Sequence, residues 1–441
     1  MRYGQVGSNV GGVAAKFAAQ RLFNLSGNAD KDALQLAQAL GGLKGPIMKV
    51  AQLLATIPDA LPPEYAEELA KLQSAAPPMG WAFTKRRMSS ELGADWQSHF
   101  AAFDREPAAA ASLGQVHKAI LKDGTRVACK LQYPDMQSAV EADLRQLGWA
   151  FSVHRRMRPP VDTREILKEI GDRIREELDY TREAANAAIY RTVLANHDEI
   201  TVPTVYNELS TRRLLTMGWL TGKPMLDYKE ASLEERNLLA KAMFKAWWHP
   251  FANYGVIHGD PHLGNYTVFE VDAAPAGINL LDFGCIRIFP GNFTRGVVDL
   301  YHGLLHDDEE LVVSAYELWG FKGLSREVIE ILNMWARFIY GPILDDRVRT
   351  IADGISPGAY GRKEAFSVAK ALKEKGPVTI PREFVFMDRA AIGLGAVFLH
   401  LAAELNFYEL FNEEIDGYAP ETVAANQARV LNEIDHPAAA A

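Results

Sequence analysis

The stretch His258-Gly259-Asp260-Pro261-His262-Leu263-Gly264-Asn265, with Asp282-Phe283-Gly284 further along, decides the fold expected for this chain. Asp260 is followed five positions later by Asn265, and two short predicted strands separate Asn265 from Asp282. Phosphoryl-transfer enzymes use this order of acid, amide and acid to hold a base and metal ligands. Because Mg2+ prefers oxygen ligands, Asp282 and Asn265 are candidate metal ligands, and Asp260 is the candidate catalytic group that orients a nucleophile's proton. The alternative is a polar loop arranged by chance.

A β-hairpin predicted upstream carries one lysine in an apolar frame. Segments 115–121 and 125–133 have strand character, and the Asp-Gly pair between them suits a tight turn. Lys130 lies in Val127-Ala128-Cys129-Lys130-Leu131, which is similar to the Val-Ala-Ile-Lys strand whose lysine holds nucleotide phosphates. The alternative is a solvated lysine on an alternating strand.

A run of small residues stands directly before this hairpin. It consists of Ala108, Ala109, Ala110, Ala111 and Ser112. Small side chains let a backbone approach a ligand closely, so the run is a candidate phosphate-covering loop. Four alanines also suit a helix or low-complexity filler, and the residues alone leave that alternative open.

An acidic cluster is predicted on a long helix that begins near position 164. Its members are Glu176, Glu177, Asp179 and Glu183. Residues three or four apart share a helical face, where like charges cost stability unless a cation faces them. Lys130 is the natural partner of Glu183, and a merely solvated acidic face is the alternative.

A helical N-terminal extension is predicted from the spacing of apolar residues over positions 30–72. Lys49 and Gln52 are three apart and project from the same side of a helix there. As a bare pair they are surface residues. After position 221 the chain is predicted to be mainly helical.

Composition excludes several classes of protein. The chain has 441 residues, 47 Lys and Arg, 56 Asp and Glu and a net charge of −9, which argues against a nucleic-acid binder. With 48% hydrophobic residues it is expected to be globular. Its two cysteines, Cys129 and Cys285, indicate neither a disulfide framework nor a zinc site and fit a reducing compartment. The longest apolar stretch, 390–403, is too short to span a bilayer, and 1–23 lacks the features of a secretory signal.

Together these motifs resemble the UbiB/AarF family of atypical protein-kinase-like proteins over positions 40–401. Lys49-Val50-Ala51-Gln52 is similar to the family's Lys-x-Gly-Gln signature, with Ala51 in place of the usual glycine. The family also replaces the Gly-rich nucleotide loop with an Ala-rich one. The resemblance implies that the Ala-rich run covers ATP and that Lys130 binds its phosphates, with Glu183 as the lysine's helix partner.

The resemblance also implies a regulatory element. Glu177 and Asp179 look like the family's Glu-x-Asp element, whose carboxylates face the N-terminal helix. Lys49 and Gln52 on that helix would then cover the place where a protein substrate docks.

A hinge is implied at Met217-Gly218-Trp219, where Gly218 stands in place of the family's usual acidic residue. Adenine contacts would therefore rest on backbone groups of Met217 and Trp219. ATP and Mg2+ are the cofactors that the resemblance implies.

The resemblance implies an α+β, protein-kinase-like two-lobed fold with a helical N-terminal extension packed over the active site. The expected domains are an extension over 1–100, an N-lobe over 101–220 and a helical C-lobe over 221–441. The implied function is a Mg-dependent atypical kinase or ATPase that supports coenzyme Q (ubiquinone) or related isoprenoid-lipid metabolism. The implied partners are an isoprenoid lipid or quinone precursor and coenzyme Q biosynthetic proteins. The expected location is cytoplasmic and peripheral to the inner membrane.

Two alternatives belong to other classes. A small-molecule phosphotransferase of the aminoglycoside or choline kinase type also uses a His-Gly-Asp loop, but the Lys49/Gln52 helix and the Ala-rich run argue against it. A nucleotide-sensing, lipid-binding scaffold would need no turnover, and the full set of catalytic residues counts against it.

Overall fold

The computed structural model describes residues 79–352 and 382–436, except Ser112, Asp143, 146–170 and Arg173, and in addition Val368, Ala371 and Ala438. The predicted N-terminal helices, with Lys49 and Gln52, lie outside the described residues. The chain divides into two compact units. Unit 1 takes the residues up to Arg182 together with Tyr206–Trp219, and unit 2 takes Glu183–Val205 together with the residues from Leu220 onward.

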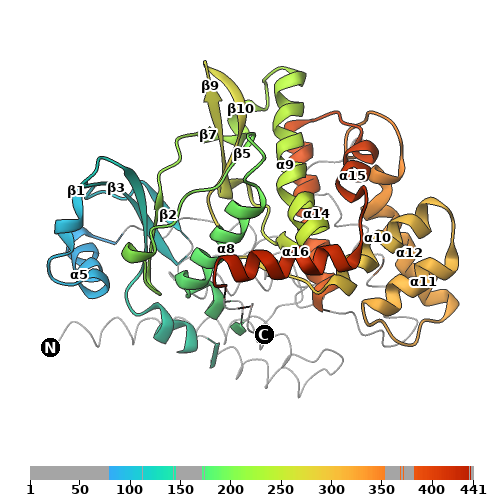
Figure 1. The fold of residues 1–441 in the computed structure, drawn as a ribbon, viewed down its shortest axis with the longest axis horizontal. Coiled ribbons are helices and arrows are strands. Elements are labelled where there is room, and N and C mark those ends of the chain that lie inside the picture. The colour runs from blue at the N-terminus through green and yellow to red at the C-terminus, as the bar shows by residue number, and fades with distance from the viewer. Residues whose placement is uncertain are drawn as a thin grey trace, which may run out of the picture. The chain divides into compact units, whose positions relative to one another are not determined.

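Unit 1 is built on an antiparallel sheet (Figure 1). Its strands are β1 (Phe100–Phe103), β2 (Ala109–Ala111), β3 (Gly114–Leu121), β4 (Arg126–Gln132) and β6 (Leu214–Gly218). The order is β1-β3-β4-β6, and β2 pairs with β3. The hairpin predicted over 115–133 is confirmed as β3 and β4, and Gly124 in the turn has a φ of 88°, which favours glycine.

The sheet of unit 1 buries one face against aromatic and aliphatic side chains. Helix α5 (Trp81–Leu92) contributes Met88, and η1 (Trp96–His99) contributes Trp96, both buried. The Trp96 ring lies 5.2 Å from that of Phe103, edge to face. This packing makes β4 a central, rigid strand, and β4 carries Lys130.

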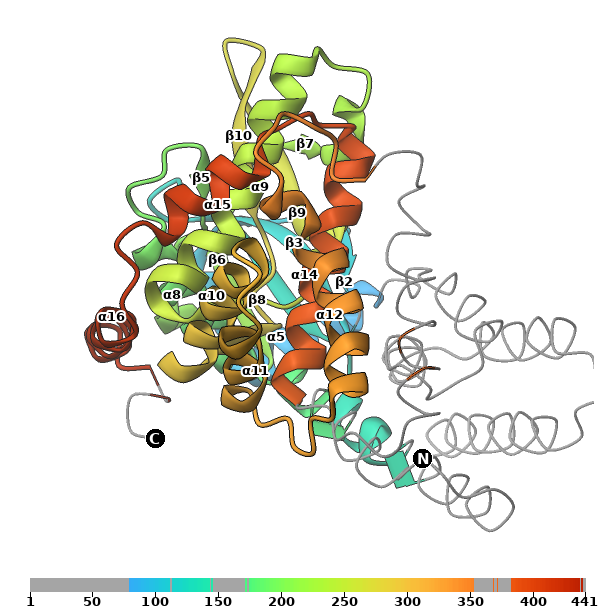
Figure 2. The same cartoon turned by 90° about the vertical axis from the view of Figure 1, so that its right-hand side faces the viewer.

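Helix α9 (Leu233–Tyr254) is the centre of unit 2. It begins with a capping box between Ser232 and Glu235 and ends at Gly255, whose φ of 64° suits the left-handed end of a helix. Figure 2, in which α16 is seen end-on, shows α12 beside α14. The surrounding helices are α10 (Gly291–Leu305), α11 (Glu309–Leu318), α12 (Arg326–Tyr340), α14 (Arg382–Leu401), α15 (Phe407–Ile415) and α16 (Pro420–Glu433).

Short strands of unit 2 position the polar loops. β9 (Tyr266–Val271) and β10 (Ala274–Leu280) form a hairpin flanked by β5 (Ile200–Thr201) and β7 (Lys223–Pro224). A separate pair, β8 (Val256–His258) and β11 (Ile286–Ile288), brackets them in sequence. The two short strands predicted between Asn265 and Asp282 are confirmed as β9 and β10, and β10 ends at Leu280. Asp282 therefore lies in the loop beyond the sheet.

The predicted continuous acidic helix is wrong at one point. The helix that includes Glu176 ends at Glu177, and α8 (Tyr180–Val193) begins after Asp179. Oδ1 of Asp179 accepts a hydrogen bond from the Thr181 N–H at 3.1 Å, as an N-cap residue does. Capping satisfies an N–H of the first turn, so Asp179 starts a second helix and does not continue the first.

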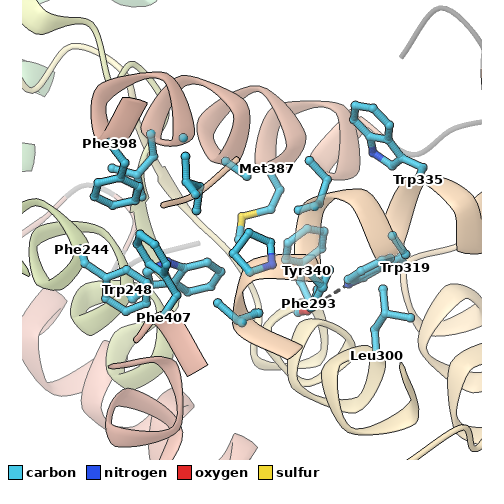
Figure 3. Close-up of a pocket in the computed structure, with 18 residues that line it drawn as sticks. Phe244, Trp248, Phe293, Leu300, Trp319, Trp335, Tyr340, Met387, Phe398 and Phe407 are labelled. Carbon is cyan, nitrogen blue, oxygen red and sulfur yellow. Dashed lines mark hydrogen bonds between the residues drawn. The ribbon is translucent and has the colours of Figure 1, made fainter. Parts of the chain in front are cut away.

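The core of unit 2 contains an apolar cavity of about 70 Å³. Figure 3 shows Met387 and Phe398 of α14 on one side and Tyr340, Phe244 and Trp248 on others. None of the predicted catalytic or metal-binding residues lines it. Among the described residues, no helix is long and apolar enough to cross a membrane.

Candidate active site

His258 ties the two polar loops of unit 2 together. Its Nε2 lies 2.7 Å from the main-chain oxygen of Asp282, and its Nδ1 accepts the N–H of Asp260 at 3.2 Å. This pattern requires a neutral ring with its hydrogen on Nε2. Burial is the main cause that lowers the pKa of His258, which agrees with the neutral form. Trp247 donates to the carbonyl of His258 at 2.8 Å and fixes the strand end.

Asp260 and Asn265 are joined across the loop that contains η4 (Leu263–Asn265). Nδ2 of Asn265 donates to the main-chain oxygen of Asp260 at 3.0 Å, and the Tyr266 hydroxyl donates to the same oxygen at 3.2 Å. Because the amide nitrogen is the donor, the amide oxygen is the atom of Asn265 that suits a cation. These two hydrogen bonds tie the end of the loop to its start at Asp260.

A main-chain hydrogen bond joins the segment that contains Asp282 to Asn265. The Leu281 N–H donates to the Asn265 carbonyl at 2.9 Å, and Oδ1 of Asp282 accepts the Gly284 N–H at 3.0 Å. Phe283 is fully buried, so the side chain between Asp282 and Gly284 anchors the segment in the core. The structure therefore brings Asp260, Asn265 and Asp282 into one loop cluster, and their catalytic and metal-binding roles stay predictions.

One face of α8 packs on the Asp-Phe-Gly segment. Asn186 donates from Nδ2 to the Phe283 carbonyl at 2.9 Å, and the Tyr190 ring lies 5.7 Å from the Phe283 ring. Glu183 is 3% exposed, and a Cβ built on Gly284 would lie 4.0 Å from its Oε2. Asn186 and Tyr190 were not predicted as site residues, although their spacing from Glu183, three and seven positions, places all three on one helical face.

The donors of unit 2 fit Mg2+. Asp282 would supply a carboxylate and Asn265 an amide oxygen, and a main-chain hydrogen bond from Leu281 to Asn265 joins the two segments. In the described part of the chain, no group of three His, Cys, Asp or Glu side chains is arranged to hold a metal alone. Mg2+ is usually held by one or two carboxylates and completes its shell with water and substrate phosphates, which matches this sparse set.

Lys130 is held in the middle of the unit 1 sheet. Its register neighbours are Val116 on β3 and Leu215 on β6, and it is 8% exposed. Its Nζ lies 5.2 Å from the centre of the Tyr180 ring. The aromatic face attracts the ammonium and helps to fix its position. Glu183 belongs to unit 2, so the Lys130–Glu183 pair stays a prediction.

The Ala-rich run is extended and is not a helix. Ala109, Ala110 and Ala111 form β2, which pairs with Val116, Gln115 and Gly114 of β3. The Ala108 N–H adds a bond to the Val116 carbonyl at 2.8 Å. A Cβ on Gly114 would lie 2.1 Å from the Leu131 carbonyl oxygen, so only glycine fits there. Ser112 lies outside the described residues, and the role of the run in binding ATP stays a prediction.

The hinge segment continues from β6. Met217 pairs with Ala128 and is buried, and the Trp219 N–H donates to the Arg126 carbonyl at 3.0 Å. An adenine contact at Trp219 would therefore rest on its carbonyl oxygen and not on its N–H. Lys118 lies over the Trp219 ring at 4.4 Å and holds it in place.

One of the two predicted regulatory acids, Asp179, has partners within unit 1. Asp179 caps α8 and lies 3.5 Å from Nε of Arg212. Glu177 precedes the break between the two helices. Because Lys49 and Gln52 lie outside the described residues, the predicted contact with them stays a prediction.

This fold and this site define a kinase-like protein. The ABC1 atypical kinase-like domain matches residues 71–316. The chain therefore belongs to the ABC1 atypical kinase-like family, which confirms the predicted UbiB/AarF resemblance.

Several known proteins are similar to the chain. Protein ACTIVITY OF BC1 COMPLEX KINASE 8, chloroplastic, of Arabidopsis thaliana is 31% identical over 61% of this chain and 36% of its own length. Atypical kinase COQ8B, mitochondrial, of Rattus norvegicus is 29% identical over 69% and 59%. A solved structure, the Rv3197–erythromycin complex from Mycobacterium tuberculosis, has a TM-score of 0.61 and 28% identity over 87% of this chain and 96% of that one. The chain thus spans between about a third and three-fifths of the length of these curated relatives.

Proposed function

We propose that the protein is a Mg2+- and ATP-dependent phosphotransferase or ATPase of the atypical kinase type. The observation that supports this most is the pair of hydrogen bonds by which His258 joins the main chain of Asp260 to that of Asp282. These bonds hold the proposed base and the proposed metal-binding acid in one loop cluster. Preorganised groups of this kind supply most of the catalysis in phosphoryl transfer.

Each residue has a distinct part in the proposal. Asp260 accepts or orients the proton of the nucleophile, which is a hydroxyl or water. Asp282 and the amide oxygen of Asn265 hold Mg2+, and Lys130 binds the phosphates of ATP. When bound, Mg2+ neutralises charge on the phosphate oxygens. The extended β2–β3 hairpin, with Gly114 at its closest approach to β4, covers the nucleotide.

The physiological role that we propose is support of coenzyme Q or related isoprenoid-lipid metabolism, at the periphery of a membrane and together with other biosynthetic proteins. The support is membership of the ABC1 family and similarity to COQ8B. The roles implied by the family resemblance are also part of the proposal. They are the lysine partner Glu183, the hinge residues Met217 and Trp219, and the regulatory residues Lys49, Gln52, Glu177 and Asp179.

The test is ATP hydrolysis with Mg2+ by the wild type and by Asp282→Asn, with and without liposomes and phenol-like quinone precursors. Asp272→Asn is the matched control, because Asp272 is exposed in the β9–β10 turn. We expect turnover to fall by about a hundredfold or more in Asp282→Asn alone. Erythromycin, the ligand of the similar structure, is added as a further probe.

Three results would contradict the proposal. Equal turnover in wild type and Asp282→Asn would remove the metal-binding role. Nucleotide binding without turnover under any condition would favour the scaffold alternative, and ATP-dependent phosphorylation in a screen of small alcohols would favour the small-molecule kinase.

A further inference from the structure

The segment after α16 returns to α8 inside unit 2. The main chain turns at His436, whose N–H donates to the Leu431 carbonyl at 2.9 Å, and the imidazole is 7% exposed. Its Nε2 lies 3.4 Å from Oδ1 of Asn186, a residue 250 positions earlier. Asn186 is the residue whose Nδ2 bonds the Phe283 carbonyl.

The direction of these bonds follows from their partners. The Phe283 carbonyl can only accept, so the nitrogen of the Asn186 amide must face it and the amide oxygen must face His436. Nδ1 of His436 accepts the Ala438 N–H at 3.1 Å, so the ring hydrogen is on Nε2 and points to Asn186. Three buried groups thus form a chain with a single allowed polarity.

We propose that His436 is a positioning residue that holds Asn186, and through it the Asp-Phe-Gly segment, in the arrangement the active site needs. The position of the segment is inferred from the contacts alone. Only the effect on turnover rests on the proposed function.

The chemistry explains why the histidine matters. An asparagine amide is nearly symmetric in shape, and without a donor at Oδ1 it can rotate by half a turn. The rotated amide would place its oxygen against the Phe283 carbonyl, two acceptors in a buried site, which is unfavourable. The Phe283 carbonyl thus disfavours the rotated amide, and His436 adds a second restraint by supplying a donor on the oxygen side.

Thiol labelling tests the proposal without ATP. Cys285 follows Gly284 directly and is half-buried, so its reaction rate reports opening of the Asp-Phe-Gly segment. The second cysteine of the chain, Cys129, is 0% exposed and serves as an internal check that unit 1 stays folded. We expect His436→Ala to label at Cys285 about three to ten times faster than the wild type, the effect of one lost hydrogen bond.

Four variants complete the test. His436→Gln keeps a donor and should label like the wild type, and His99→Ala, an exposed histidine of unit 1, should too. Asn186→Asp cannot donate to Phe283 and should match His436→Ala. The double variant His436→Ala/Asn186→Asp should be no faster than either single one, because both act on the same chain of bonds.

The proposal is overturned by wild-type labelling in His436→Ala, by fast labelling in His436→Gln, or by additive rates in the double variant. If Cys129 also labels faster in His436→Ala, the labelling rates of Cys285 in His436→Gln and Asn186→Asp are compared instead. Faster labelling in Asn186→Asp alone supports the proposal, and equal rates overturn it. Equal ATP turnover in the wild type and Asp282→Asn would remove the proposed ATP chemistry but would not affect the labelling result. With turnover present, His436→Ala should lower kcat and His436→Gln should restore it.

Discussion

The imidazole of His258 uses both ring nitrogens on the two polar loops: Nε2 lies 2.7 Å from the Asp282 carbonyl oxygen and Nδ1 lies 3.2 Å from the Asp260 nitrogen. Only the neutral ring can make both bonds. Protonation would turn Nδ1 into a donor that faces the N–H of Asp260.

Acid is therefore expected to destabilise the protein near the ordinary pKa of histidine. Burial lowers the pKa values of His258 and His117 below 6.5, so the unfolded chain binds more protons than the folded one as the pH falls through that value. The contribution of these two histidines to stability is fully present above pH 6.5 and is lost as the pH falls below it.

The measurement is the melting temperature at about pH 7.5 and about pH 5.5. It should be lower at the acid pH, and the drop should shrink in His258→Gln, which retains a donor and does not titrate. A melting temperature that is constant or rises on acidification would contradict this.

Helix α14 packs closely against the loop that contains Asp260, with Gly393 next to Pro261. A Cβ on Gly393 would lie 2.4 Å from Cγ of Pro261, which adjoins Asp260. Gly393→Ala should therefore displace the loop and lower kcat by about tenfold to a hundredfold, since a shift near 1 Å is enough for that. Gly341→Ala, where a Cβ meets nothing within 4 Å, is the control. Full activity of Gly393→Ala would show that Pro261 moves without effect.

The Ala-rich strand should influence nucleotide binding through its stiffness. Ala109→Gly adds backbone freedom to β2 opposite Val116, at a cost of about 0.5–1 kcal/mol in local order. We expect altered affinities for ADP and ATP, measured by calorimetry. Ala119→Gly, on the neighbouring strand β3, controls for a general loss of sheet stability. Unaltered affinities would reject a role of β2 in covering phosphate.

The cavity in unit 2 offers a stabilising change. Ala391 lines it from α14, and Ala391→Leu would fill part of its volume with a good helix former. The free energy of unfolding should rise by about 1 kcal/mol. Ala425→Leu, exposed on α16, should change it by less than about 0.5 kcal/mol. A lower melting temperature for Ala391→Leu would mean that the cavity walls cannot move apart.

Local patterns predicted much of this molecule because their causes are local. The β3–β4 hairpin follows from strand alternation and an Asp-Gly turn, and the mainly helical character predicted after position 221 is confirmed by α9. The short hairpin predicted between Asn265 and Asp282 is also present, as β9 and β10.

Other features depend on contacts that no local pattern encodes. His258 was not assigned a role, because its two partners become visible only when β8 and β11 pair. Asn186 meets Phe283 across 97 positions. Asp179 was expected to continue a helix, and its capping role depended on the competition between helix propensity and a side-chain bond.

The bond between Asn186 and His436 also sets an order of events during synthesis. A ribosome makes α8 and the Asp-Phe-Gly segment long before position 436 emerges, so the nascent chain holds Asn186 without its histidine. The loops of unit 2 can assemble early, but the last of these bonds closes only after α16 has been made. Maturation of the site is thereby tied to translation of the far end of unit 2.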